Sequence, residues 1–214
     1  MDCAGHLPVL ANEVVELLGP SVRQADNPTM VDATVGLGGH AEAMLESFDR
    51  LRLIGMDLDQ TNLLKTKERL RRFGERARLF EGNFADVETV LAETGLPSVE
   101  AVLADLGVSS STQLDDPARG FSFQSEGPLD MRLSRHGGRT AADLVNRLAE
   151  RELADLIFRL GEERPSRRIA RAIVRARLEA PICTTTRLAE IVARAAPSRG
   201  RIHPATRTFM ALRI

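Results

Sequence analysis

Met30-Val31-Asp32-Ala33-Thr34-Val35-Gly36-Leu37-Gly38-Gly39-His40 is the stretch of sequence that decides the fold of this chain. Its first residues are mostly apolar and predict a buried strand, and its three glycines let the backbone turn tightly without Cβ clashes. A helix is predicted over residues 39–48, so the N–H groups of its first turn would face whatever the loop holds. This order of strand, glycine loop and helix predicts a site for a nucleotide or a related cofactor.

An acidic residue follows the next predicted strand at the spacing of a ribose-binding carboxylate. The second strand is predicted over residues 51–56, and Asp57 comes about 20 residues after the first glycine of the loop. Together the two features indicate a cofactor that contains adenosine. The spacing Gly36-x-Gly38-x-x-Ala41 also satisfies the dinucleotide fingerprint, so a nicotinamide dehydrogenase and a tight turn without a ligand both stay open.

Asp32 lies inside the first predicted strand, four residues before Gly36. An acid at this position favours a methyltransferase that uses S-adenosylmethionine (AdoMet) over a dehydrogenase. A buried carboxyl needs hydrogen-bond partners, which the N–H groups of the loop would supply. A purely structural Asp32 that ties the loop down is the alternative.

The remaining predicted elements of this half alternate between helix and strand, at residues 60–72, 76–80, 86–93 and 99–105. This βαβαβαβ order requires right-handed crossovers and a parallel sheet, with ligands at the carboxyl ends of the strands. The candidate residues that fall at those ends are Gly38, Asp57, Asn83, Phe84 and Asp105. An aromatic residue such as Phe84 would contact an adenine ring, although filling of the core is an equally open interpretation.

From residue 143 onward the pattern becomes helical throughout. Thr140-x-x-Asp143 is able to cap a helix, Gly161 and Pro165 separate the next two, and another helix is predicted over residues 186–196. The fold class is therefore predicted as α/β, with a Rossmann-like sheet domain and a second, all-α part. A long loop rich in Gly, Ser and Pro joins the two parts, and long loops in compact domains tend to be functional.

The charge of the chain divides in the same way. The formal net charge is −11 over residues 1–131 and +10 over residues 132–214, where every basic residue except histidine is Arg. A cluster of six arginines with no acid inside it is formed by Arg164, Arg167, Arg168, Arg171, Arg175 and Arg177. Such a cluster favours contact with nucleic acid over solvated helix faces with local ion pairs, because it cannot be neutralised locally.

Aromatic residues in the long loop offer a second contact for RNA. Phe121 and Phe123 beside Arg119 would stack on and clamp an unpaired base, or else would fill the seam between the two parts. Several other classes of function are disfavoured. No run of 18 apolar residues and no signal peptide is present, which predicts a cytoplasmic location without a membrane partner. The two cysteines and four histidines lack ligand spacing, so no metal site is expected.

Motifs distributed over the whole chain resemble one family, the ribosomal RNA small subunit methyltransferase H family. They are His6-Leu7-Pro8-Val9-Leu10, Gly38-Gly39-His40, Asp105-Leu106-Gly107-Val108-Ser109-Ser110, Gln113-Leu114-Asp115, Arg119-Gly120-Phe121-Ser122-Phe123, Gly127-Pro128-Leu129-Asp130-Met131-Arg132 and His203-Pro204-Ala205-Thr206-Arg207-Thr208-Phe209. The resemblance implies AdoMet-dependent methylation of the N4 amino group of a cytidine in the decoding region of 16S ribosomal RNA.

The resemblance also implies a domain arrangement and a set of site residues. A class I AdoMet methyltransferase domain is expected over residues 1–111, a loop with an inserted helical domain facing RNA over 112–202, and a return to the first domain over 203–214. The implied cofactor contacts are Gly38, Gly39, His40, Asp57, Phe84, Asp105 and Gln113. The expected contacts with 16S ribosomal RNA are Arg119, Phe121, Phe123, Arg132, Arg167, Arg168 and Arg171.

No catalytic residue is assigned, because the chain has no Pro-Pro-aromatic motif after its fourth predicted strand. Methyl transfer from a sulfonium needs no nucleophilic side chain, only alignment of the amine with the methyl group and exclusion of water. Family members continue well beyond the His203 motif, so the C-terminal part of the fold is expected to be missing. An uncovered sheet edge then predicts a homodimer, or a non-catalytic protein for RNA binding or ribosome assembly.

Overall fold

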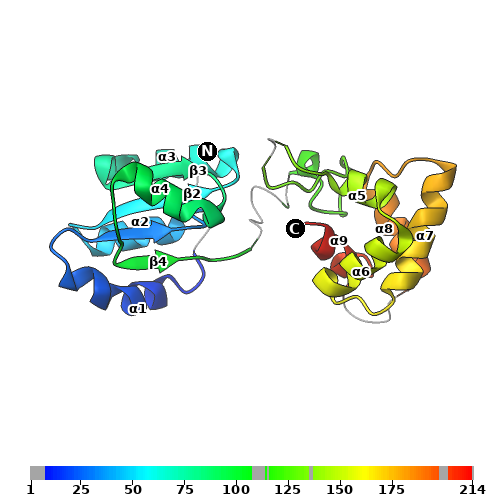
Figure 1. Ribbon diagram of the computed structural model, residues 1–214, viewed down its shortest axis with the longest axis horizontal. Coiled ribbons are helices and arrows are strands. Elements are labelled where there is room, and N and C mark those ends of the chain that lie inside the picture. The colour runs from blue at the N-terminus through cyan, green and yellow to red at the C-terminus, as the bar shows by residue number, and fades with distance from the viewer. Residues whose placement is uncertain (1–7, 108–113, 115, 135–136, 198–201, 214) are drawn as a thin grey trace. The chain divides into compact units, whose positions relative to one another are not determined.

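A computed structural model describes residues 8–107, 114, 116–134, 137–197 and 202–213. The chain forms two compact units, Met1–Gly107 and Val108–Ile214, whose helices and strands are drawn in Figure 1. In the described ranges, no helix is both long and apolar enough to cross a membrane.

The first unit contains a parallel four-stranded sheet with the order β3-β2-β1-β4. Its strands are β1 (Thr29–Asp32), β2 (Arg52–Asp57), β3 (Ala77–Glu81) and β4 (Ala101–Leu103). β1 is central and wholly buried, with Val31 opposite Ile54 of β2 on one side and opposite Val102 of β4 on the other. The Rossmann-like α/β class predicted from the sequence is therefore confirmed, and all four predicted strands are present.

Helices cover both faces of the sheet. The helices are α1 (Ala11–Gln24), α2 (Gly39–Ser47), α3 (Gln60–Leu70) and α4 (Val87–Thr94). Residues of α1, α2 and α3 share one core with Met30 and Leu53, whereas Val90 of α4 packs on the opposite face with Val31 and Ile54. None of the sequence patterns predicts α1, which contains Pro20 in its interior.

The direction in which successive strands are added to the sheet reverses at β1. The chain runs outward from β1 to β2 and β3, then crosses to the other side of β1 through α4 to form β4. β1 therefore has β2, the next strand in sequence, on one side and β4, the last of the four, on the other. In open α/β sheets, ligands bind in the crevice at such a switch point.

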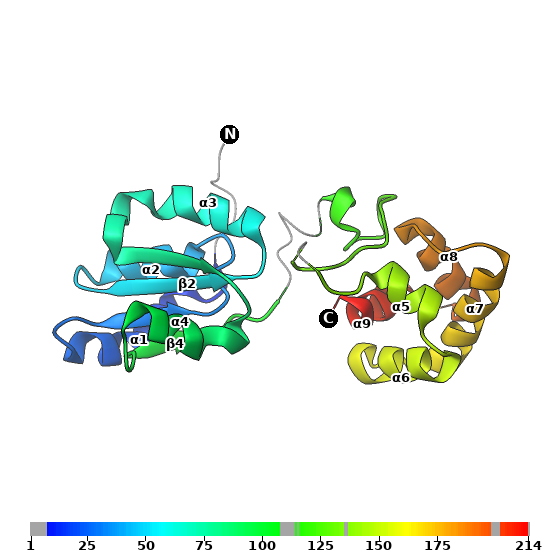
Figure 2. The ribbon, with the colours of Figure 1, turned by 45° about the horizontal axis from the view of Figure 1, so that its top comes forward.

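The second unit is helical, as predicted. Its helices are α5 (Ala141–Arg147), α6 (Glu150–Gly161), α7 (Ser166–Glu179), α8 (Thr185–Ala195) and α9 (Thr206–Leu212). Thr140 caps α5 and Asp143 returns the hydrogen bond, which confirms the capping pair predicted from the sequence. One apolar core joins Leu153 and Ile157 of α6 to Ile169 of α7 and Phe209 of α9, and α9 lies beside α6 in Figure 1 and in Figure 2.

The segment before α5 is anchored to the helices. A short 3-10 helix, Pro117–Arg119, is followed by Gly120 at φ +70°, where a Cβ would lie 2.0 Å from the carbonyl oxygen of Pro128. Leu129 donates its N–H to the carbonyl of Cys183. This part of the long loop is therefore packed into the helical unit.

The contacts divide the chain after Gly107. The predicted boundary after residue 111 lies outside the described residues. Residues 203–214 were expected to return to the sheet domain, but α9 packs on α6, and Phe209 and Leu212 belong to the core of the helical unit. In this structure α9 therefore belongs to the helical unit, because Phe209 and Leu212 are buried in its core.

Gly161 allows α6 and α9 to cross closely. It is the last residue of α6, and the left-handed position that follows is taken by Glu162 at φ +51°. A Cβ on Gly161 would lie 2.3 Å from the carbonyl oxygen of Arg207 and 3.1 Å from the Cβ of Ala211. The glycine is needed here for the approach of a second backbone rather than for its own dihedral angles.

We predict that Gly161→Ala destabilises the helical unit. Helix propensity alone would favour Ala by about 0.5–1 kcal/mol, but the clash with a backbone oxygen forces α6 and α9 apart, so the free energy of unfolding should fall by roughly 1–3 kcal/mol. Urea unfolding followed by circular dichroism measures this change. Arg159→Ala on the exposed side of the same helix is the control, with an expected change within about 0.5 kcal/mol. A Gly161→Ala variant at least as stable as the parent would contradict the prediction.

Candidate functional site

The loop after β1 is held in place by α3. Gly36 and Gly38 have φ values of +53° and +77°, which non-glycine residues rarely adopt. Thr66 of α3 donates its hydroxyl to the carbonyl of Gly36 at 2.6 Å, and its methyl group would lie 2.8 Å from a Cβ on Gly38. Gly38 precedes α2, and no side chain caps that end of the helix. The predicted glycine turn is thus confirmed, with its backbone close against α3.

Asp57, at the end of β2, joins three segments through its carboxylate. Oδ2 accepts the N–H of Gly36 at 3.0 Å and the side-chain amide of Asn62 at 3.1 Å. Oδ1 accepts the N–H of Asp59 at 2.7 Å. A carboxylate has about four acceptor positions, so these three donors, which are the ones seen among the described residues, leave one acceptor position on Oδ1.

Burial raises the pKa of the Asp57 carboxyl, although the N–H groups of Asp59 and Gly36 and the amide of Asn62 act in the opposite direction. Asn62 is itself buried in the first turns of α3. The amide therefore fixes the orientation of a carboxylate that is only partly exposed to solvent.

A second bridge connects the loops after β1 and β4. Thr34 donates its N–H to Oδ1 of Asp32 at 3.2 Å, and its hydroxyl oxygen accepts the N–H of Asp105 at 2.7 Å. This bridge spans the switch point between the two strands. Asp105 is exposed beside it, at the position predicted from the sequence.

Asp32 is an acid in an interior position, with a side chain only 2% exposed. Burial raises its pKa to about 7, and the hydrogen bond from Thr34 offsets this only in part. The carboxylates of Asp105 and Asp57 raise the pKa further, while His40 lowers it. Asp32 and Asp105 are both bonded to Thr34, and Asp57 is bonded to Gly36 two residues further on. The three acids therefore lie at the same end of the sheet, at the carboxyl ends of β1, β2 and β4.

The other predicted cofactor residues lie around this cluster in different ways. The Nε2 atom of His40 is 2.8 Å from the carbonyl oxygen of Val9, so its side chain is engaged with the segment before α1. Gly39 lies against Pro8 of the same segment. Phe84 follows β3 and is 45% exposed, which does not fit the core-filling alternative. Gln113 lies outside the described residues.

The arrangement favours a ligand with positive charge. Three carboxyl groups and the glycine loop meet at one end of the sheet, and a carboxylate in a poorly solvated position is stabilised by a nearby cation. A pyrophosphate would bring further negative charge to the same place. No group of three His, Cys, Asp or Glu suited to a metal ion occurs within the described ranges.

Three residues expected to contact RNA have other roles in the helical unit. Arg119 is 4% exposed, and its Nη2 donates to the carbonyls of Arg132 and Leu133 at 3.0 and 2.9 Å. Phe121 is fully buried in the core. Arg132 is bound to both carboxylate oxygens of Asp130 and to the carbonyl of Gly137. The expectation that Arg119 and Phe121 contact RNA is therefore wrong for this structure, because both side chains are buried and no base can reach them. The guanidinium group of Arg132 is engaged with Asp130 and Gly137.

The other four expected RNA residues are at least partly exposed. Phe123 stacks on His203 with ring centroids 4.5 Å apart and meets Phe209 edge-on at 4.9 Å. Arg167, Arg168 and Arg171 are exposed on α7. Among the described residues, no contact joins Phe123 to Arg167, Arg168 or Arg171.

Thr34, Asn62 and Thr66 support the site but were not predicted from the sequence. Each acts through a hydrogen bond to a loop or to a carboxylate. The spacing of Thr66 and Asn62 along α3 follows the helix repeat and resembles that of ordinary helix residues, so it gave no signal. For Thr34, its position inside the glycine stretch is a signal from which its role could have been predicted.

Comparison with known proteins relates the chain to methyltransferases. The chain is 48% identical over 211 residues to the ribosomal RNA small subunit methyltransferase H of Sorangium cellulosum, covering 98% of this chain and 65% of that protein. The protein of that name from Methylobacterium sp. is 49% identical, and the match covers 100% of this chain and 63% of that protein. The one from Pelobacter propionicus is 50% identical, and the match covers 98% of this chain and 67% of that protein. The chain thus spans about two thirds of the length of these relatives.

The profile of the MraW methylase family matches residues 3–214. The match includes the glycine loop, the three carboxyl residues at the strand ends and the whole helical unit. Taken with the Rossmann-like sheet and the identities of nearly one half, it shows that the chain belongs to the MraW methylase family.

Proposed function

We propose that the chain carries out AdoMet-dependent methylation of the N4 amino group of a cytidine in the decoding region of 16S ribosomal RNA. The names of its relatives support the reaction and the RNA. The observation that carries the choice of cofactor is the cluster of Asp32, Asp57 and Asp105 around the glycine loop, because AdoMet bears a sulfonium and an ammonium group.

The described residues fit the adenosine part of this cofactor. In the proposal, the remaining acceptor position on Oδ1 of Asp57 takes one ribose hydroxyl, and the exposed ring of Phe84 contacts the adenine. Gly38, Gly39 and the backbone of His40 border the ligand from the loop, while Asp105 and Gln113 complete the set. When bound, AdoMet supplies a methyl group activated by the positive sulfur.

The protein side of the reaction consists of positioning. The amine of cytosine is a weak nucleophile because its lone pair is delocalised into the ring, so acceptors for its N–H groups would favour the geometry for attack. We propose that Asp105 or loop carbonyls next to it provide these acceptors, since Asp105 is exposed beside the cluster. The base must reach them unpaired or turned out of a helix. No specific catalytic residue is proposed.

The proposed partner is 16S ribosomal RNA in the small subunit, which accords with the cytoplasmic location predicted from the sequence. Phe123 stacks on the exposed His203, so this pair offers a flat surface for an unpaired base. Arg167, Arg168 and Arg171 remain proposed contacts with the phosphates. A homodimer formed through the side of β4 that pairs with no other described strand, where Val102 is 55% exposed, also belongs to the proposal.

A non-catalytic role in RNA binding or ribosome assembly is the second candidate, and the exposed arginines of α7 favour it. A nicotinamide dehydrogenase is less compatible with the site. Its anionic pyrophosphate would lie beside the carboxyl cluster, where the repulsion would be unfavourable.

Calorimetry with AdoMet tests the first candidate against the second. We expect saturable binding, and Asp57→Asn should weaken it roughly 10- to 100-fold because a charge-assisted hydrogen bond is removed. Asp26→Asn, an exposed change between α1 and β1, is the control and should bind as the parent does. Methyl incorporation into small ribosomal subunits then measures activity. A folded chain that gives no heat with AdoMet would leave RNA binding as the function.

The pH dependence of cofactor binding should depend on Asp32. Its pKa of about 7 means that the carboxyl holds about half a proton at pH 7. A cationic ligand favours the ionised form, so binding should release up to roughly half a proton per site, and affinity should rise as pH increases through 7. Calorimetry in buffers with different ionisation enthalpies measures the release. Proton uptake, or the same release in Asp32→Asn, would contradict this prediction.

A further inference from the structure

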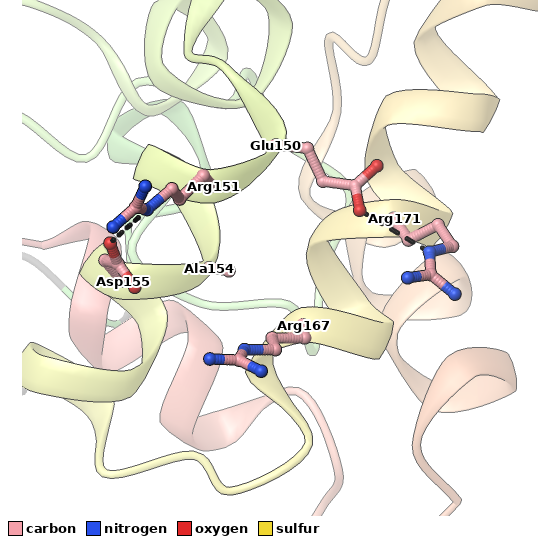
Figure 3. A pocket seen from close by; sticks show the side chains of 6 residues that line it. All are labelled: Glu150, Arg151, Ala154, Asp155, Arg167 and Arg171. Carbon is pink, nitrogen blue, oxygen red and sulfur yellow. Dashed lines mark hydrogen bonds and ion pairs between the residues drawn. The ribbon is translucent and has the colours of Figure 1, made fainter.

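A hollow in the helical unit is lined by charged side chains from two helices. Its volume is about 400 Å³, and its lining consists of Glu150, Arg151, Ala154, Asp155, Arg167 and Arg171. Figure 3 shows guanidinium groups around it from both α6 and α7, with the small side chain of Ala154 between them. The hollow lies entirely within one unit, so its shape does not depend on where the other unit lies.

Two of its three arginines are held by weak ion pairs. The Nε atom of Arg171 is 3.4 Å from Oε1 of Glu150, and Nε of Arg151 is 4.0 Å from Oδ2 of Asp155. The four side chains are between 45% and 94% exposed. Long ion pairs between exposed groups contribute little, because water and salt compete for both partners. A ligand with several acceptor oxygens is therefore able to replace the acids.

Arg167 is the third cation, and no hydrogen bond or ion pair to another described residue is seen for it. It differs in this from its neighbour Arg168, whose Nε donates to the carbonyl of Ala195, and from Arg177, which donates to the carbonyls of Val145 and Leu148. Figure 3 shows the Arg167 side chain extending beside the hollow without a dashed contact. Arg167 therefore supplies a charge that the described part of the protein does not neutralise.

We propose that this hollow binds a phosphodiester group of the RNA backbone, with Arg167 and Arg171 as the principal donors and Arg151 at the edge. The planar fork of a guanidinium matches two phosphate oxygens at once. A volume of about 400 Å³ also accommodates the sugar attached to the phosphate. This inference rests on the proposed function, and it names the contact that holds the substrate rather than the site where the methyl group is transferred.

Glu150 and Asp155 have a defined role in this proposal. They hold Arg171 and Arg151 until RNA arrives, and the phosphate then displaces them. The two acids consequently compete with the ligand. Removal of an arginine and removal of an acid at the same site should therefore change RNA affinity in opposite directions.

Binding of a fluorescent single-stranded RNA with the decoding-region sequence, measured over a series of salt concentrations, tests the proposal. The double variant Arg167→Gln/Arg171→Gln should bind at least about tenfold more weakly at moderate salt, and the slope of log affinity against log salt should fall by about 0.7 for each phosphate that is no longer neutralised. Glu150→Gln should instead strengthen binding several-fold, because it releases Arg171.

An ion pair on α8 provides matched controls. Nη1 of Arg187 is 3.6 Å from Oε2 of Glu190, and the two side chains are 45% and 55% exposed, much like the pair of Arg171 and Glu150. Arg187→Gln and Glu190→Gln change the net charge equally but lie outside the hollow. If the control changes alter RNA affinity as much as Arg171→Gln and Glu150→Gln, general charge attraction is the cause and the proposal is overturned.

Two further measurements separate this inference from the proposed function. AdoMet binding by the same variants should equal that of the parent, because none of them lies in the α/β unit. A parent chain that binds RNA only as tightly as Arg167→Gln/Arg171→Gln overturns the phosphate site and leaves the methyltransferase proposal intact. Poly-glutamate should compete poorly with RNA, and equal competition would overturn the proposal in favour of an acidic protein partner.

Discussion

The carboxylate of Asp57 connects the three segments that meet at the carboxyl end of the sheet. It accepts the N–H of Gly36 from the glycine loop, the N–H of Asp59 at the start of α3, and the amide of Asn62 one turn later. With Thr66 bound to the carbonyl of Gly36, the loop is fixed at both backbone groups of one residue. The left-handed turn at Gly36 and Gly38 is therefore fixed relative to β2 and α3. The arrangement of Asp32, Asp57 and Asp105 around the loop depends on that position.

The sequence was most informative where a residue type has few structural uses. Three glycines between a strand and a helix, with an acid after the next strand, predicted the loop and Asp57 because few arrangements besides a ligand-binding turn combine these features. The same reasoning did not find α1, since Pro20 in its interior usually marks the end of a helix. It also did not find Asn62 or Thr66, whose roles depend on which face of α3 packs against the loop.

The arginines of the helical unit show the limit of counting charge along a sequence. Arg119, Arg132 and Arg177 all donate hydrogen bonds to backbone carbonyls of the unit. Each adds to the positive charge of the unit, but its guanidinium group stabilises the fold. Arg167 and Arg171 differ from these three arginines only in the groups that lie next to them after folding. A charge count predicts that a surface is basic, whereas the partner of each guanidinium decides which arginines remain available to a ligand.

The segment before α1 has a practical consequence for experiments on this protein. Pro8 lies against Gly39, and the carbonyl of Val9 is bonded to His40, so this segment covers the first turn of α2 beside the glycine loop. A substitution at Pro8 would therefore change the packing against Gly39, so a variant made in this segment should not serve as a neutral control in binding experiments on the glycine loop.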